Sequence, residues 1–559
     1  MAFPWGVSSI ISLISSYLIV SIQPEWSYSY MFRTFISVWF FQVFLYGVWS
    51  VILYPKVFSP LIGLPEPKGG SWLMGQFGAI RKYPTGIPMR EWVATIPNDG
   101  IIRYLSVLNQ ERLLISGPKA LGEVLVTKSY DFKKPGAIRF GLGRLLGIGV
   151  LLAEGDEHKF QRRSLLPAFA FRHIKDLYPS FWNKGREAAQ AMTNDIIAKA
   201  AKGTSSPDPE KAEKTAVIDV GGWASRATLD IIGASGLGRD FGAIQNPNTE
   251  LNAMYQRVFS PSKQGQRLAF LGSFIPNWIL AALPVKRNEE IGEAAKFIRT
   301  VCRDLIREKK ETIARKEVAG RDILSVALES GAFAEENLVD QLMTFLAAGH
   351  ETTATAMTWA VYMLSRYPAM QKRLRDEIRE KLPSIDDDSG RDVTSLDIDR
   401  MPYLNAVCNE VLRYYAPVPL TLREAAVDTS ISGIRVPKGT IIAISPWATN
   451  FDREQWGPDA HEFNPDRWMP KSADDKRAAS GGASSNYSFL TFLHGPRSCI
   501  GLAFAKAEFA CLLASWLGRF EFALKNLEEM DERNVEIKGG ITARPLNGMH
   551  VHATVVDGW

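Results

Sequence analysis

Near the start of the chain, two apolar runs without charged side chains restrict the possible folds more than any other feature. Residues 1–24 carry no charged side chain, and residues 34–54 form a second charge-free run that is rich in Trp, Phe, Val and Leu. At 1.5 Å per helical residue, the 21 residues of the second run can cross a hydrocarbon core of roughly 30 Å. The sequence therefore predicts a membrane-spanning helix in the second run.

The first run is shorter, and the sequence leaves its role open. Residues 5–22 are rich in serine, and they fit a second span, a re-entrant segment or a signal sequence. A removed signal peptide is disfavoured, because no basic segment precedes the run and no small-residue cleavage site stands out in it.

The residues after the second run indicate an orientation and a domain boundary. Four prolines between residues 55 and 67 predict a stiff linker. We therefore place the membrane anchor and linker at residues 1–60 and one large domain at residues 61–559. Under the positive-inside rule, the basic residues that follow the run place this domain in the cytosol. These residues are Lys56, Lys68, Arg81, Lys82 and Arg90.

A third apolar stretch, residues 268–285, is interrupted by Pro276 and Pro284. Two prolines disfavour a continuous spanning helix, because each removes a backbone donor and clashes with the preceding turn. The stretch fits either an interfacial patch that dips into lipid or a buried core segment. The sequence alone leaves both interpretations open.

The rest of the chain has the pattern of one large, mostly helical domain. Residues 337–366 are apolar nearly all round, which predicts a buried core helix. Residues 425–444 alternate in polarity and contain turn residues, which predicts a small sheet region. With 65 basic and 60 acidic residues, the net charge of +5 gives no reason to expect nucleic acid. The four cysteines are scattered and form no CxxC pair, which argues against a disulfide framework and a thiolate zinc site.

The most informative motif is residues 492–501, where Cys499 stands in a glycine-rich loop before an apolar, alanine-rich helix. A helix N-terminus stabilises a thiolate through its partial positive charge and its free N–H groups. Gly495 and Gly501 let the backbone and a flat cofactor come close. Arg497 can pair with a carboxylate at the edge of that cofactor. The motif favours a thiolate ligand over a buried structural cysteine, the usual fate of an isolated Cys.

A polar notch interrupts the long apolar helix at Gly349, Glu351 and Thr352. Glycine costs a helix interior about 1 kcal/mol relative to alanine. An ionisable group in an apolar surround is costly unless the protein uses it. A threonine can hydrogen-bond backward along the helix and open it to water. The alternative is a helix crossing that requires small residues.

Together these motifs resemble the cytochrome P-450 superfamily. Residues 492–501 are similar to its haem-thiolate loop, residues 348–353 to its oxygen-binding notch, and residues 410–413 to its Glu-x-x-Arg pair. From about residue 65 to the C-terminus, the order of motifs fits the eukaryotic microsomal type, closest to the fungal branch. The resemblance implies a mainly α fold with minor β, in which a large helical domain with small sheets surrounds a buried haem.

The resemblance also implies a cofactor and its contacts. The cofactor would be haem b (iron protoporphyrin IX), with Cys499 as the axial ligand of the iron. Glu351 and Thr352 would deliver protons during catalysis. His158 stands at a position where tryptophan is common in the family, and Arg423 matches a propionate-binding arginine. The haem-contacting residues that the resemblance implies are His158, Arg162, Arg423, Phe492, Gly495, Arg497 and Gly501.

The interpretation of one further pair, Glu410 and Arg413, depends on the resemblance. Glu410 and Arg413 are three residues apart on an expected helix, and most pairs of this kind are plain surface ion pairs. In the family, such a pair joins a third residue, here Arg467, in a buried charge cluster that secures the haem-loop region. A buried triad of this kind is structural rather than catalytic.

The implied activity is that of a membrane-bound monooxygenase in secondary-metabolite biosynthesis, which uses O2 to hydroxylate or epoxidise a lipophilic small molecule. No GxGxxG fingerprint occurs in the chain, so electrons would come from NADPH-cytochrome P-450 reductase at the endoplasmic reticulum membrane. An alternative on the same fold is an isomerase or dehydratase that rearranges peroxides, but such relatives typically lack the Glu-Thr notch. The residues that would line the substrate pocket by resemblance are Phe345, Val418, Leu420 and Ile541.

Overall fold

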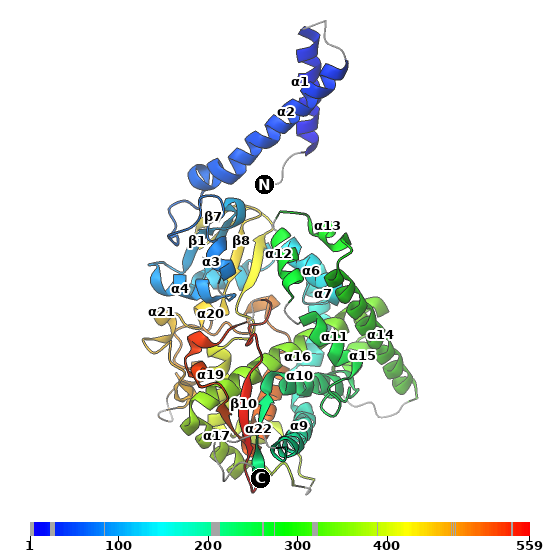
Figure 1. The fold of residues 1–559 in the computed structure, drawn as a ribbon, viewed down its shortest axis with the longest axis vertical. Helices are drawn as coiled ribbons and strands as arrows, with labels where there is room; N and C mark the ends of the chain where they lie inside the picture. Colours follow the sequence, from blue (N-terminus) through cyan, green and yellow to red (C-terminus); the bar gives the residue numbers. More distant parts are fainter. Residues whose placement is uncertain are drawn as a thin grey trace.

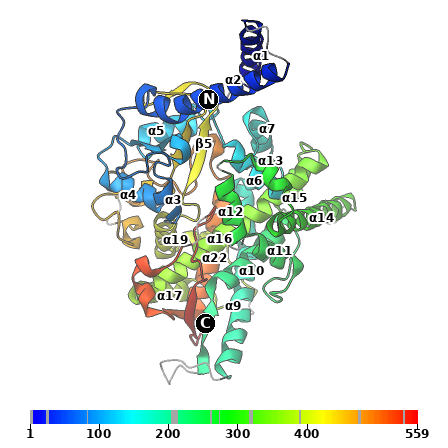
Figure 2. The same ribbon diagram turned by 45° about the horizontal axis from the view of Figure 1, so that its top comes forward.

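The computed structural model of the chain is a mainly helical domain with small sheets, from which two N-terminal helices project (Figure 1). A turned view again shows both helices outside the domain (Figure 2). This architecture confirms the mainly α fold with minor β. The structure describes residues 5–22, 28–82, 84–202, 213–259, 262–272, 274–315, 322–387, 390–470, 472, 475, 477–537 and 540–559.

The N-terminal helices α1 (Trp5–Ile22) and α2 (Tyr28–Val48) pack against each other. Gln42 of α2 donates a hydrogen bond to a serine hydroxyl of α1 at 3.2 Å. Small side chains allow helix backbones to approach closely in lipid. By length and composition, Trp5–Ile22 and Ser29–Phe58 can each cross a membrane, so the first apolar run joins the second as a candidate span. The buried face of α1 consists of serines spaced by four residues, Ser8, Ser12 and Ser16.

The helix α2 continues as a π-helix, η1 (Trp49–Phe58), and the end of η1 is attached to the large domain. Arg103 donates a hydrogen bond to the carbonyl oxygen of Pro55. Asn109 Nδ2 donates to the carbonyl oxygen of Val51 at 2.9 Å. We expected Pro55 in the linker, but it lies inside η1. Because proline lacks an N–H, it fits a segment where the helical hydrogen-bonding pattern changes.

The described residues form three sheets besides the helices, and the largest sheet lies on the side of the anchor (Figure 1). Its strand order is β1-β2-β8-β5-β3, with β2 and β8 parallel and the other neighbours antiparallel. The second sheet has the order β4-β10-β9, and the third is the hairpin β6-β7. The strands are β1 (Ile101–Leu105), β2 (Glu111–Ile115), β3 (Phe132–Lys133), β4 (Thr215–Asp219), β5 (Thr421–Ala425), β6 (Thr429–Ile431), β7 (Ile434–Val436), β8 (Ile441–Ile444), β9 (Phe520–Leu524) and β10 (His550–Val555).

The sheet region predicted at residues 425–444 is confirmed in β6, β7 and β8. Ser432 and Gly433 form the tight turn of the β6-β7 hairpin, with φ angles of 51° and 87°. Two consecutive positive φ angles match the right-handed twist of the flanking strands. A glycine at the second position adopts this conformation without steric cost.

The centre of the domain is α16 (Glu335–Arg366), a 32-residue helix that is buried on nearly every side. Its existence confirms the core helix that the apolar run at residues 337–366 predicts. It packs against α10, α14, α19 and α22. The bounds of these four helices are Val220–Ile231 for α10, Lys286–Ala314 for α14, Pro402–Tyr414 for α19 and Leu502–Arg519 for α22.

Shorter helices surround this core. The remaining α-helices are α3 (Phe77–Lys82), α4 (Ile87–Thr95), α5 (Pro118–Gly122), α6 (Gly136–Leu146), α7 (Gly155–Leu165), α8 (Phe171–Ile174), α9 (Tyr178–Ala200), α11 (Glu250–Phe259), α12 (Lys263–Leu271), α13 (Asn277–Ala282), α15 (Ile323–Glu329), α17 (Pro368–Lys381), α18 (Ser395–Asp399), α20 (Pro446–Thr449) and α21 (Arg453–Trp456). Three single-turn or irregular helices matter for the site: η7 (Ile232–Leu237), η8 (Pro465–Trp468) and η10 (Gly495–Arg497).

The apolar stretch at residues 268–285 is broken into α12 and α13, with Pro276 at the N-cap of α13. Trp278 is 66% exposed, whereas Leu280 is buried. The described side chains of this stretch therefore lie mainly on the surface, and the expectation of a buried core segment is wrong for them. Contact between this surface and lipid stays a prediction.

Candidate functional site

The cysteine loop lies between η10 and the N-terminus of α22. The backbone N–H of Cys499 donates to the carbonyl oxygen of Phe492 at 2.8 Å, which closes the loop. Gly495 has a φ of 73°, and a Cβ at this position would overlap the carbonyl oxygen of Leu125. Among the described residues, the nearest atom to a Cβ on Gly501 would be Phe169 Cε1, at 3.8 Å. Close packing inside the protein therefore explains the glycine at 495 but not the one at 501.

Cys499 is the one exposed cysteine among the four, because Cys302, Cys408 and Cys511 are buried. Crowding by neighbouring protein atoms raises the pKa of the Cys499 thiol, while the N–H of Gly501 and the charge of Arg162 lower it. The helix N-terminus expected from the sequence thus acts on the sulfur without making it a thiolate by itself. Iron coordination deprotonates a thiol outright, so Cys499 fits a metal-bound thiolate.

A cluster of buried cations lies beside this loop. Arg497 forms an ion pair with Glu154, yet among the described residues its Nε and Nη1 have no hydrogen-bond partner. Within the described part of the chain, Arg423 of β5 donates only to the Thr421 hydroxyl and the Leu422 carbonyl oxygen, at 3.1 and 2.9 Å. Burial and the charge of Arg497 lower the pKa of Arg423 to about 10.

Lys134 adds a third cation to this cluster. Burial and the nearby charge of Arg423 lower the pKa of Lys134 to about 7. Glu154 therefore faces several cations that compete for one carboxylate. Buried charges require partners, so the cluster has room for additional negative charge. The two propionates of a haem provide such charge, and the residues present fit that cofactor.

The two residues expected on α7 have different surroundings. His158 is buried, and its Nδ1 lies 3.1 Å from the Tyr130 hydroxyl. Burial and the charge of Arg497 lower the pKa of His158 to about 4, so the imidazole is neutral near pH 7. Arg162 binds the cysteine loop instead, with Nη1 donating to the carbonyl oxygen of Ser498 at 2.6 Å. The structure therefore places Arg162 on the loop and His158 beside the cations.

The sequence did not indicate a role at the site for Tyr130, Lys134 or Glu154. Lys134 follows another lysine and precedes a proline, a context that does not distinguish a buried lysine from an exposed one. Glu154 lies just before α7, where an acidic residue is ordinarily read as a favourable helix-terminus charge. Only the fold brings these groups together with Arg423 and Arg497.

The polar notch lies in the middle of α16. Glu351 is buried, and its Oε1 accepts a hydrogen bond from the Thr542 hydroxyl at 3.0 Å. Its Oε2 lies 3.4 Å from Arg544 Nη1. The Thr352 hydroxyl donates backward to the carbonyl oxygen of Ala348 at 2.8 Å. α16 remains a continuous helix here, so this bond does not open it.

Both interpretations of the notch have support in the structure. A Cβ on Gly349 would lie 3.0 Å from Ile232 Cγ1, so a small residue is needed where α16 crosses η7. A cavity of about 270 Å³ reaches Glu351 and Arg544 from the side of α10 and α11. Helix crossing and a polar site therefore share one segment. Other lining residues of this cavity are Asp219, Ser225, Tyr255 and His350.

The charge cluster around Glu410 is fully enclosed. Arg413 donates from Nε and Nη2 to the two oxygens of Glu410 at 2.8 and 2.7 Å. Arg467 Nε donates to Glu410 Oε1 at 3.1 Å. Asn450 joins the cluster to the cysteine loop, because its side chain donates to the Arg413 carbonyl oxygen and to the Thr491 hydroxyl, each at 3.0 Å. The cluster thus fixes the segment that leads into Cys499.

The four residues expected to line a substrate pocket differ in exposure. Phe345 of α16 is buried and packs edge-to-face on Phe169, with ring centroids 5.3 Å apart. Val418 and Leu420 are half-buried, and Ile541 is 49% exposed. This range of exposure fits a lining that runs from the core to the surface.

Comparisons with known proteins point to the same family as the sequence motifs of this site. The family model described as Cytochrome P-450 matches residues 65–551 of the chain. Cytochrome P-450 monooxygenase sphH of Aspergillus fumigatus is 46% identical over 529 residues, covering 93% of this chain and 94% of that protein. Cytochrome P-450 monooxygenase FUM15 of Gibberella moniliformis is 45% identical over 560 residues, covering 93% of each chain. Cytochrome P-450 monooxygenase buaD of Petromyces alliaceus is 41% identical over 533 residues, covering 95% and 94%.

Proposed function

Because the chain belongs to the cytochrome P-450 family, we propose that it is a membrane-bound monooxygenase that hydroxylates or epoxidises a lipophilic small molecule in secondary metabolism. Family membership makes haem the cofactor and monooxygenation the class of reaction. The observation that carries the proposal is the exposed Cys499 beside the buried Arg497, whose Nε and Nη1 have no hydrogen-bond partner among the described residues.

Three residues hold the cofactor in this proposal. Cys499 ligates the iron, and Arg423 and Arg497 pair with the propionates. Their guanidinium groups suit this task, because a planar fork of donors matches a carboxylate. Bound haem with a thiolate ligand supplies the activation of dioxygen and favours O–O cleavage.

Glu351 and Thr352 move the protons that oxygen activation consumes. Glu351 borders a cavity of about 270 Å³ that also contains polar side chains, which gives its carboxyl group a route for proton exchange. The Thr352 hydroxyl donates its hydrogen to the Ala348 carbonyl oxygen. Its own oxygen can therefore still accept a hydrogen bond from a proton donor. Glu351 thus gathers a proton, and Thr352 orients it at the reacting centre.

Electrons reach the protein from NADPH through cytochrome P-450 reductase in this proposal. The absence of a GxGxxG fingerprint from the sequence supports an external electron source. The candidate spans Trp5–Ile22 and Ser29–Phe58 support attachment to the endoplasmic reticulum membrane, with the domain in the cytosol.

A reduced carbon monoxide difference spectrum tests the cofactor ligand. The wild-type protein and a Cys302→Ala control are expected to give the thiolate-type spectrum, because Cys302 is buried. Cys499→Ala is expected to abolish that spectrum. If it survives in Cys499→Ala, the ligand assignment is wrong.

Metabolite comparison tests the reaction. Extract from a strain that lacks this protein is incubated with the protein, the reductase, NADPH and isotopically labelled dioxygen. The expected product carries one labelled oxygen atom and forms only when NADPH is present. A product that forms without NADPH or dioxygen would support the peroxide-rearranging alternative instead.

A further inference from the structure

The two N-terminal helices have the polarity of a soluble helix pair in reverse. The buried face of α1 carries serine hydroxyls, whereas its large apolar side chains are exposed. These exposed side chains include Val7, Ile10, Ile11, Ile14, Leu18 and Ile19. Four phenylalanines of α2 are also more than half exposed, namely Phe32, Phe40, Phe41 and Phe44. A helix pair in water buries its apolar face, so this arrangement favours lipid as the surroundings of both helices.

The polar groups of α1 are hydrogen-bonded within the helix pair. The Ser12 hydroxyl accepts a hydrogen bond from Gln42 Nε2 of α2 at 3.2 Å. The Ser16 hydroxyl donates to the carbonyl oxygen of Ser12 at 2.5 Å. Ser9 and Ser21 likewise donate to the carbonyl oxygens four residues before them, at 2.8 and 2.7 Å. In hydrocarbon a polar group without a partner is costly, and these bonds therefore allow a serine-rich helix to lie in lipid.

The short connection between α1 and α2 fixes their relative direction. From Ile22 to Tyr28, six peptide bonds reach roughly 22 Å at most. The 18 residues of α1 are longer, at roughly 27 Å. Because the two helices pack against each other, α2 must run back along α1. Figure 1 agrees, since the start of α1 and the end of α2 both lie toward the domain.

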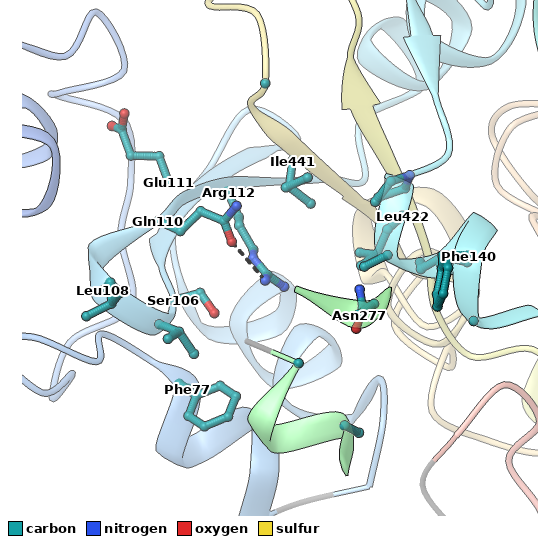
Figure 3. Close-up of a pocket in the computed structure, with 18 of the residues that line it drawn as sticks. Phe77, Ser106, Leu108, Gln110, Glu111, Arg112, Phe140, Asn277, Leu422 and Ile441 are labelled. Atoms are coloured by element: carbon teal, nitrogen blue, oxygen red, sulfur yellow. Dashed lines mark hydrogen bonds between the residues drawn. The ribbon is translucent and has the colours of Figure 1, made fainter. Parts of the chain in front are cut away.

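The second apolar run leaves the hydrocarbon where η1 meets the domain. Ser106, Gln110 and Arg112 of the β1-β2 hairpin line a cavity of about 960 Å³ that η1 also borders (Figure 3). Arg112 Nη2 donates to Gln110 Oε1 at 3.2 Å. Lys56 of η1 donates to the carbonyl oxygen of Trp72 at 2.9 Å. Polar and charged groups of this kind belong in water or among lipid head groups, so the hydrocarbon part of the run is α2.

The lengths of α1 and α2 match a bilayer and each other. α1 spans roughly 27 Å and the 21 residues of α2 span roughly 32 Å, close to the ~30 Å of a hydrocarbon core. α1 contains no charged side chain, and α2 contains one, the exposed Arg33 near its start. An arginine close to a helix end can extend its guanidinium to the head groups.

We propose that α1 and α2 form a hairpin that crosses the membrane twice, with lipid acyl chains as the partner of its exposed apolar surface. The N-terminus and the large domain then lie on the same side of the membrane. A single crossing by α2 would place them on opposite sides. This inference goes beyond the proposed function, which attaches the protein to the membrane without stating how often the chain crosses it.

Glycosylation mapping of the full-length haem protein in microsomal membranes tests the hairpin. A flexible tag with an Asn-Ser-Thr acceptor is placed before residue 1 or between residues 23 and 24, and it gains a glycan only in the lumen. Residues 486–488, Asn-Tyr-Ser, are an acceptor of the chain itself and report the domain, with Asn486→Gln as the control. A glycan is expected on the tag between residues 23 and 24 and at neither other position. The carbon monoxide spectrum of the same membranes verifies that each tagged protein is folded.

Three other patterns have distinct meanings. A glycan on the N-terminal tag without one at Asn486 would overturn the inference, because the chain would cross the membrane an odd number of times. No glycan at any of the three positions would overturn it as well, because the connection between α1 and α2 would not reach the lumen. Glycans on the N-terminal tag and at Asn486, with none between α1 and α2, would support the hairpin but place the domain in the lumen, contrary to the proposed function.

Cross-linking tests the packed face of the hairpin without an inserted tag. Ser12→Cys and Gln42→Cys are combined in one chain and treated with a short bis-maleimide. Ile14→Cys with Gln42→Cys is the matched control, because Ile14 is exposed. The first pair is expected to cross-link within one chain about fivefold more than the control, since residues two apart point to different sides of a helix. Equal yields would overturn the inference. Cross-links between two chains would also overturn it, because a second copy would then cover the serine face.

Discussion

Glu351 and Glu410 are both buried glutamates that face an arginine, but the structure holds them in different ways. Glu410 accepts hydrogen bonds from Arg413, Arg467, the Asn464 backbone and the Trp468 indole, at 2.7 to 3.1 Å. Glu351 accepts a hydrogen bond from the Thr542 hydroxyl at 3.0 Å and a long one from Arg544 Nη1 at 3.4 Å.

Under the proposed function, this difference separates a structural carboxylate, Glu410, from a catalytic one, Glu351. Every oxygen lone pair of Glu410 faces a donor, so releasing it exposes several buried groups at once. Glu351 borders a cavity of about 270 Å³ and has a long contact with its arginine, and the proposed function assigns it the proton transfer. We therefore expect Glu410 to control folding and Glu351 to control turnover.

Breaking the Glu410 cluster is expected to have the largest effect. Arg413→Ala leaves a buried carboxylate without its main partner, which typically costs about 3–5 kcal/mol. The variant is expected to lose haem incorporation and thermal stability, measured by absorbance and by thermal unfolding. Arg373→Ala removes an exposed ion pair with Asp466 and is the control, with an expected cost below about 1 kcal/mol. Equal effects of the two variants would contradict the structural role of the cluster.

Thr352→Ala tests whether the notch that contains Glu351 and Thr352 positions a proton during turnover. Haem content and substrate binding are expected to remain, because a small residue replaces a small one. Product formation is expected to fall by about 10²-fold, the lower end of typical acid–base contributions. NADPH oxidation with the reductase continues, and hydrogen peroxide rises in place of product.

The control for Thr352→Ala is Ser365→Ala, which removes a similar hydroxyl that donates to a backbone carbonyl at the far end of α16. It is expected to leave coupling unchanged. If Thr352→Ala keeps full product yield, the notch does not position a proton and the comparison with Glu410 loses its functional meaning.

Arg544→Gln is expected to have a smaller effect, because it changes a residue that positions Glu351. The maximal rate is expected to fall about three- to tenfold, since a weak contact of this length is worth roughly 1 kcal/mol. The Michaelis constant and haem content are expected to stay the same, whereas a purely structural role would change haem content as well. Arg533→Gln, an exposed pair with Asp531, is the control. Steady-state kinetics and haem absorbance provide the readouts.

Glu508 on α22 extends the comparison to a buried glutamate that faces the Thr353 hydroxyl and forms no ion pair among the described residues. Burial raises its pKa well above the usual range. The folded protein then holds this proton more tightly than the unfolded chain, so the stability it contributes is present at low pH and is lost as pH rises through the folded pKa.

Glu508→Gln is expected to remove this pH dependence. The variant should match the wild type at about pH 4 and unfold roughly 1–3 °C higher near pH 8, as measured by thermal unfolding at both values. A variant that is less stable than the wild type near pH 8 would show that the carboxyl is ionised and paired in the folded protein.

Several features of the molecule follow from local sequence. The apolar run at residues 337–366 predicts α16, because apolar residues on all sides of a helix require burial on all sides. The turn at Ser432 and Gly433 predicts the β6-β7 hairpin, since glycine adopts a positive φ at low cost. The spacing of Glu410 and Arg413 on one helix face brings that pair together without help from distant segments.

Tertiary structure decided the rest, because the decisive partners are far apart in the chain. Thr542 and Arg544 lie 191 and 193 residues from Glu351, and no local pattern connects them. Lys134 and Glu154 become part of the cation cluster only when β3, α7 and β5 come together around Arg423. Burial converts ordinary surface residue types into strongly interacting charges, and burial is a property of the packed chain rather than of any short segment.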